Sequence, residues 1–213
     1  MSRMNRSALD HLRILPALFT LQSAAAVLNV EPRVASIYLK RWRDAGLISS
    51  LSDPKEGQRT GIHFNLVLNP DAAREHRADA IALLYPRAVI GGASAVHAAG
   101  WTTQIPRALE ILIPTTRTIV EIPDVAISTR SQAWFRKFHG SFQSNGALPR
   151  LEPAFALADA WAKRTWRPDP DELEWDLVDA AALRAAFADV GCEIPEDWLE
   201  ELEDGGPAQA GLR

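Results

Sequence analysis

The sequence predicts an α+β protein of two domains followed by a short tail. Apolar residues recur at helical spacing over roughly the first 45 positions and then with a period of two up to residue 68, whereas helical and strand-like segments alternate beyond residue 70. The chain of 213 residues is long enough to bury two modest cores. We therefore expect domains at residues 1–69 and 70–203, and a flexible tail at residues 204–213, which hold three glycines and show no periodicity.

Three helices are expected in the first domain. The first covers residues 7–15, and the second begins after Thr20, whose hydroxyl can cap its N-terminus. Asn29 tolerates the left-handed conformation of a tight turn, and Pro32 suits the first turn of a third helix, which should end at Gly46. A short helix, a tight turn and a longer helix form the pattern of a helix-turn-helix unit.

The third helix has two different faces. The apolar face, which we expect to point inward, holds Ala35, Tyr38, Leu39 and Trp42. The opposite face carries cations among small and apolar groups, and it comprises Arg33, Ser36, Ile37, Lys40, Arg41 and Asp44. Such a face can enter the major groove of B-DNA, where arginine contacts guanine through two hydrogen bonds. The residues of this helix that we expect to contact DNA are Arg33, Ser36, Ile37, Lys40 and Arg41. Ile37 has two interpretations, contact with a thymine methyl group or burial against a neighbouring segment.

A β-hairpin is expected after the third helix. Residues 47–51 form an apolar run, and Ile62, Phe64, Leu66 and Leu68 alternate with other residues as in a half-buried strand. The loop between the two strands carries Lys55 and Arg59, which we expect to contact DNA phosphates. Three helices and a hairpin of this kind predict a winged helix-turn-helix DNA-binding domain. A winged helix that serves only as a structural or protein-docking module is the alternative.

The second domain is expected to mix helices with short strands. Helices are expected at residues 69–85, in a short stretch that follows Gly91–Ser94 and runs through Ala99, and at residues 132–138, 153–163, 178–190 and 195–202. Strands are expected at residues 108–113, 118–122 and 125–129, close to Pro114 and Pro123.

Sequence patterns for catalysis are weak. Ser94 and His97 lie three positions apart, but no orienting carboxylate accompanies them, so we expect Ser94 to cap a helix and His97 to be a packed or surface residue. The pair Gly91–Gly92 lacks the later glycine-lysine element of a phosphate-binding loop. The five histidines show no metal-ligand spacing, and we interpret the acidic run at residues 169–179 as a solvated segment. We therefore expect no catalytic residue, no metal site and no cofactor.

The charge distribution favours a polyanionic partner for the front of the chain. The net charge of −4 conceals values of +4 for residues 1–70, +3 for residues 71–150 and −11 for residues 151–213. No apolar run approaches the roughly 20 residues of a membrane span. A single cysteine, Cys192, cannot form an internal disulfide. We therefore expect a protein of the reducing cytoplasm that does not enter membranes.

Two blocks of sequence resemble the AbiEi-type antitoxin family of abortive-infection, type IV toxin–antitoxin systems. The first block comprises Phe19–Ala25, Tyr38–Trp42 and Gly46–Ile48. The second comprises Leu83–Gly92, then Ser94–His97, and then Gly100–Pro106. The resemblance covers roughly residues 8–165, and the acidic end beyond Asp169 lies outside it.

This resemblance implies a bacterial antitoxin that also represses its own operon. Its winged helix would bind double-stranded operator DNA, with repeated half-sites. The functional partner would be a nucleotidyltransferase-like toxin that is opposed without a stable complex, and the second domain would carry the antitoxin activity. Two other interpretations remain open, namely an ordinary winged-helix regulator whose second domain senses a ligand or a protein, and a nucleic-acid-processing enzyme.

Overall fold

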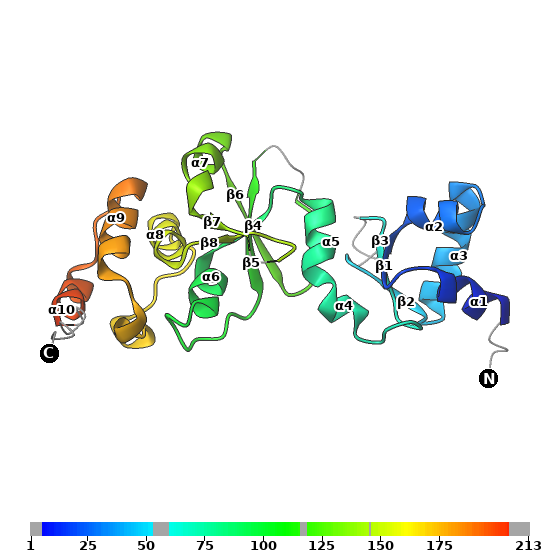
Figure 1. Cartoon of the computed structure of the whole chain (residues 1–213), viewed down its shortest axis with the longest axis horizontal. Helices are drawn as coiled ribbons and strands as arrows, with labels where there is room; N and C mark the ends of the chain where they lie inside the picture. The colour runs from blue at the N-terminus through cyan, green and yellow to red at the C-terminus, as the bar shows by residue number, and fades with distance from the viewer. Residues whose placement is uncertain (1–5, 53–59, 116–118, 145, 205–213) are drawn as a thin grey trace, which may run out of the picture. The chain divides into compact units, whose positions relative to one another are not determined.

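The computed structural model describes residues 6–52, 60–115, 119–144 and 146–204, and it shows a mixed α+β protein with two sheets (Figure 1). The chain divides into two compact units. Unit 1 comprises Met1–Pro86 with Ile119–Pro123, and unit 2 comprises Arg87–Thr118 with Asp124–Arg213. The division falls after Pro86 rather than after residue 69, because the helices that follow residue 69 belong with unit 1. Of the tail expected at residues 204–213, Asp204 is instead the last residue of a helix, and the other residues lie outside the described ones.

Unit 1 combines helices with a three-stranded antiparallel sheet. Its elements are α1 (Arg6–Ile14), β1 (Leu18–Thr20), α2 (Leu21–Val27), α3 (Pro32–Asp44), β2 (Ile48–Ser50), β3 (Ile62–Asn65), α4 (Ala72–Glu75) and α5 (Arg77–Leu84). The strand order is β1-β3-β2, so β3, which comes last of these three strands along the chain, lies in the middle of the sheet.

Local sequence signals set the bounds of α2 and α3, as predicted. Thr20 and Ser23 form a reciprocal capping box at the start of α2, in which the Thr20 hydroxyl accepts from the Ser23 amide at 3.1 Å and the Ser23 hydroxyl accepts from the Thr20 amide at 2.9 Å. Asn29 adopts the left-handed conformation with φ 51°, and Pro32 occupies the first turn of α3. Gly46, with φ 69°, follows the end of α3.

The core of unit 1 joins the helices to the sheet. Leu12 and Leu15 of the α1 region, Phe19 of β1 and Leu39 and Trp42 of α3 are all buried. Asn65 at the end of β3 has no exposed surface, and its side-chain amide donates to the carbonyl oxygens of Leu12 (2.7 Å) and Leu15 (3.1 Å). These hydrogen bonds hold α1 against the sheet and give the buried side-chain amide of Asn65 its partners.

The sequence prediction was wrong about the sheet of unit 1 in two respects. It contained no strand at Leu18–Thr20, and it described residues 62–68 as a half-buried strand. All four residues of β3 are buried, including His63 and Asn65, because β3 is paired on both sides and polar partners satisfy its polar side chains. The strand ends at Asn65, whose side-chain oxygen accepts from the amide of Leu68 in a turn that leaves Leu68 exposed.

The single helix expected at residues 69–85 is divided into α4 and α5. The division occurs at His76, whose backbone is not helical (φ −101°, ψ 16°) and whose ring lies 3.2 Å from the carboxylate of Asp79. The strand expected at residues 118–122 was also wrong, because residues 119–122 form no strand. Instead, the amide of Val120 donates to the hydroxyl of Tyr85 at 2.8 Å, which ties this segment to the end of α5.

Unit 2 is built on a five-stranded mixed sheet with the order β6-β5-β4-β8-β7. Its strands are β4 (Val89–Ile90), β5 (Leu109–Pro114), β6 (Val125–Arg130), β7 (Phe142–Gln143) and β8 (Arg150–Leu151). Its α-helices are α6 (Gly92–Ala98), α7 (Gln132–Lys137), α8 (Pro153–Lys163), α9 (Ala180–Val190) and α10 (Glu196–Asp204). Strand β5 pairs in parallel with β6 and antiparallel with β4.

The core of unit 2 is centred on α8. Helix α8 contacts both α6 and α9, and Figure 1 shows it between the sheet and α9. The buried core includes Leu157 of α8, Phe187 of α9 and Trp198 of α10. A buried ion pair joins β6 to α8, because the guanidinium of Arg130 donates to the carboxylate of Asp159 at 2.6 Å. No helix in the described part of the chain is long and apolar enough to cross a lipid bilayer.

Candidate nucleic-acid interface

Helix α3 presents the candidate interface, and its inward face holds it in place. Ala35, Leu39 and Trp42 are buried, as the helical spacing predicted. Tyr38 is half-buried and stacks on Trp42 with ring centroids 5.8 Å apart. Because these side chains anchor one side of α3, the opposite side is turned away from the core.

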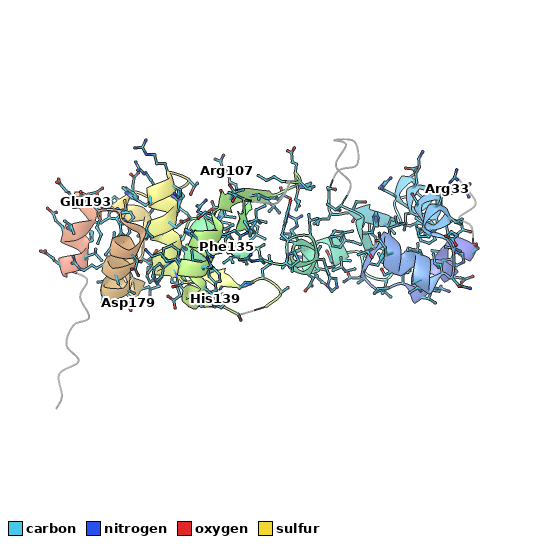
Figure 2. All side chains as sticks on the ribbon, turned by 90° about the horizontal axis from the view of Figure 1, so that it is seen from above. Arg33, Arg107, Phe135, His139, Asp179 and Glu193 are labelled. Atoms are coloured by element: carbon cyan, nitrogen blue, oxygen red, sulfur yellow. The ribbon has the colours of Figure 1, made fainter. Side chains whose placement is uncertain are left out.

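The outward face of α3 is open to solvent. All five residues of α3 that we expected to contact DNA are exposed, namely Arg33, Ser36, Ile37, Lys40 and Arg41. Arg33 lies at the surface of unit 1 (Figure 2). Ile37 is 47% exposed, so within unit 1 it is not buried against a neighbouring segment. The other two candidates, Lys55 and Arg59, lie outside the described residues.

A groove of about 500 Å³ runs beside this face, and we call it the α3 groove. Its helical side includes Leu21 and Gln22 of α2 and Ser36, Ile37, Lys40 and Arg43 of α3. Its opposite side comes from β2, β3 and the residues next to them, including Ser50, Ser52, Thr60 and His63. The outward face of α3 and the groove therefore share Ser36, Ile37 and Lys40 and form one continuous surface.

His63 is a neutral residue of this groove. The imidazole is 7% exposed, and its Nδ1 lies 3.0 Å from the Ser50 hydroxyl. Burial, together with a smaller contribution from the nearby positive charge of Arg43, lowers the pKa of His63 from 6.5 to about 4. Among the described residues that line the groove, the charged side chains are therefore Lys40 and Arg43, and none is an aspartate or a glutamate.

The sequence prediction did not include Arg43 or the groove residues of the hairpin. Arg43 follows Ser36 by seven positions and Lys40 by three, so the helical period contained a signal for it. The hairpin residues gave no such signal, because only the pairing of β2 with β3 brings Ser50 and His63 opposite one another.

The pair Ser94 and His97, which the sequence analysis considered for catalysis, lies in unit 2. The N-cap of α6 is Gly91, so the expectation that Ser94 caps this helix was wrong. Ser94 lies within α6, where its hydroxyl accepts from the amide of Glu110 at 2.9 Å and donates to the carbonyl oxygen of Ala108 at 3.3 Å. These bonds join α6 to β5, and His97 of the same helix is half-buried.

The side chain of Glu110 lies at the Gly91–Gly92 turn. The Glu110 carboxylate accepts from the amide of Ala93 at 2.9 Å, and Gly92 has φ 53°. Burial raises the pKa of Glu110, and the hydrogen bond from Ala93 opposes this effect. A carboxylate in this place disfavours the binding of phosphate to the turn. Among the described residues, no group of three or more histidine, cysteine, aspartate or glutamate side chains could hold a metal ion.

Comparisons with known proteins show a similarity of fold and no match of sequence. No protein-family model matches the sequence, and no curated protein matches it significantly. The structure is similar to the crystal structure of the RV2827C protein from Mycobacterium tuberculosis, with a TM-score of 0.56 and 14% sequence identity. The likeness covers 94% of this chain and 76% of that one. At this identity the two proteins share a fold across nearly the whole of the present chain.

Proposed function

We propose that this protein is a DNA-binding antitoxin of a type IV toxin–antitoxin system that represses its own operon. The observation that carries the DNA-binding part is the outward face of α3, where Arg33, Lys40 and Arg41 are all exposed on a helix anchored by its other side. A free helix with a cationic face has the dimensions and chemistry for the major groove.

The arrangement of unit 1 supports a winged-helix interpretation of this surface. Its elements follow the order α1, β1, α2, α3, β2, β3, with the three strands in one antiparallel sheet. This is the element order of winged helix-turn-helix domains, in which the third helix reads DNA and the hairpin contacts the backbone. The predicted wing residues Lys55 and Arg59 would then add phosphate contacts.

The antitoxin part of the proposal is supported by the sequence blocks that resemble the AbiEi-type family. These blocks extend through α6 and the segment that follows it, so they involve unit 2 as well as unit 1. The partner would be a nucleotidyltransferase-like toxin, opposed without a stable complex.

Titration of the protein with the DNA upstream of its own gene tests the repressor activity. We expect this duplex to bind more tightly than a scrambled duplex of equal length, and the logarithm of the affinity to fall linearly with the logarithm of salt concentration. Equal affinity for both duplexes would contradict sequence-specific repression.

Co-expression with the neighbouring toxin gene tests the antitoxin activity. We expect the protein to restore growth of cells that express the toxin. If the upstream DNA is bound specifically but growth is not restored, the protein is an ordinary winged-helix regulator.

A further inference from the structure

The α3 groove has the chemistry of an anion site. Its described polar side chains include the amide of Gln22, the cations Lys40 and Arg43, and several hydroxyls, with no carboxylate among them. Phosphate oxygens accept hydrogen bonds from each of these groups. Leu21 and Ile37 add apolar surface next to the donors, so the groove suits a ligand that joins a phosphate to an apolar body.

The position of the groove indicates which phosphate-bearing ligand it holds. Ser36, Ile37 and Lys40 belong both to the groove and to the outward face of α3. A duplex that receives this face in its major groove therefore brings a sugar–phosphate backbone beside α3. A volume of about 500 Å³ lies within the range of pockets that hold small ligands, and a single nucleotide unit is of this class.

We propose that the α3 groove binds the sugar–phosphate backbone of one DNA strand and that Arg43 contacts the phosphate. This inference rests on the proposed DNA binding by α3 and adds a contact residue that the outward face does not include. Arg43 is half-buried at the C-terminal end of α3, so less of its side-chain freedom is lost on binding than for a fully exposed arginine. The guanidinium can hold two phosphate oxygens at once.

His63 provides a reporter for occupancy of the groove. The charge of Arg43 contributes to the lowered pKa of His63, after the larger effect of burial. A phosphate bound to Arg43 would oppose that charge, so the pKa of His63 should rise towards its ordinary value of 6.5. NMR spectroscopy of the imidazole in the intact protein measures this change, with and without duplex.

The first experiment compares His63 titrations in the free protein, with the upstream duplex and with a deoxynucleoside monophosphate. We expect the duplex to raise the pKa of His63. No change with a bound duplex would overturn the proposal. A rise with the mononucleotide but not with the duplex would also overturn it, because the groove would then be a small-molecule pocket.

The second experiment replaces Arg43 and follows DNA affinity as a function of salt. We expect Arg43→Ala to weaken the upstream and scrambled duplexes alike and to reduce the salt slope by about 0.9, the contribution of one phosphate contact. Arg43→Lys keeps the positive charge and should retain most of the salt slope. This variant therefore distinguishes loss of a phosphate contact from loss of the fold. Arg74→Ala is the matched control, because Arg74 is an exposed arginine of α4 that does not line the groove.

The outcomes separate this inference from the proposed function. If the unaltered protein binds no duplex, both proposals fail. If it binds the upstream duplex specifically but Arg43→Ala behaves like Arg74→Ala, the groove proposal fails and the proposed function stands.

Discussion

If α3 binds DNA as proposed, Arg33 is the residue of this helix best placed to read a base. It is exposed in the first turn of the helix, and the N-terminal residues of recognition helices reach base edges. We expect Arg33→Ala to reduce discrimination between the upstream duplex and single-base variants by about 1–3 kcal/mol. Competition titrations measure this difference, with Arg74→Ala as the control. An equal loss of affinity for all duplexes would indicate that Arg33 contacts a phosphate and not a base.

His63 makes the stability of unit 1 depend on pH. The pKa of His63 is about 4 in the folded protein, and we take the ordinary value of 6.5 for the unfolded chain. Between pH 4 and pH 6.5 the imidazole therefore binds a proton in the unfolded chain but not in the folded one. Stability is therefore greatest above pH 6.5 and falls as the pH drops towards 4, by about 3 kcal/mol in total.

Urea titrations followed through the NMR signals of β3 amides measure this loss for unit 1. We expect His63→Gln to remove most of the pH dependence. His139→Gln should retain it, because His139 is exposed and belongs to unit 2. A pH dependence unchanged in His63→Gln would show that another group is responsible.

The buried ion pair of unit 2 should be far more sensitive to substitution than an exposed one. The side chains of Arg130 and Asp159 are 7% and 4% exposed, and the indole of Trp134 also donates to Asp159 at 2.9 Å. Asp159→Ala would leave the Arg130 charge buried and unpaired, which costs about 3–5 kcal/mol.

Tryptophan fluorescence in urea reports on this effect, because six of the seven tryptophans belong to unit 2. Loss of the exposed Arg13–Asp10 pair should cost unit 1 about 0–1 kcal/mol, so Asp10→Ala, followed through the NMR signals of β3 amides, serves as the comparison. If Asp159→Ala lowered the free energy of unfolding by less than about 1 kcal/mol, solvent or another group would have to neutralise the charge of Arg130.

At the scale of elements, the capping box of α2 fixes the start of the helix that supports α3. Thr20→Ala removes the hydroxyl that accepts from the Ser23 amide, and we expect a loss of about 1 kcal/mol. Hydrogen exchange should show the change in α2 and its neighbours. Ser131→Ala removes the corresponding cap of α7 and should act on unit 2 alone. Equal protection of α2 in both variants would contradict a stabilising role of the Thr20 cap.

Elements with strong local signals were predictable from the sequence. The prediction for α8 at residues 153–163 matched its bounds, and the turn at Asn29 and the start of α3 at Pro32 were also correct. Strands β1, β4, β7 and β8 were missed because each has only two or three residues, too few to show a period of two. Such strands are defined by pairing with neighbouring strands, which local sequence does not show.

The candidate site was predictable only in part, for a similar reason. The exposed face of α3 follows from helical periodicity, and the structure places its five predicted residues at the surface. The α3 groove depends on the contact of α2 and α3 with a hairpin that is distant in sequence. Neither the burial of His63 nor its proximity to Arg43 can be read from local spacing.

At the scale of the whole molecule, charge is concentrated at opposite ends of the sequence. Residues 1–70 carry +4 and residues 151–213 carry −11. On the proposed DNA binding, the positive charge of the first segment would attract the duplex, whereas the negative charge of the last segment would repel it. We therefore predict that unit 1 supplies the DNA contacts and that unit 2 does not contact DNA.

Chemical-shift mapping of the isotope-labelled intact protein with its upstream duplex shows which unit contacts the DNA. We predict that the largest changes fall on the outward face of α3, at Arg33, Ser36, Ile37, Lys40 and Arg41, and that α9 and α10 are unaffected. Binding that leaves α3 unchanged and perturbs unit 2 would contradict the account.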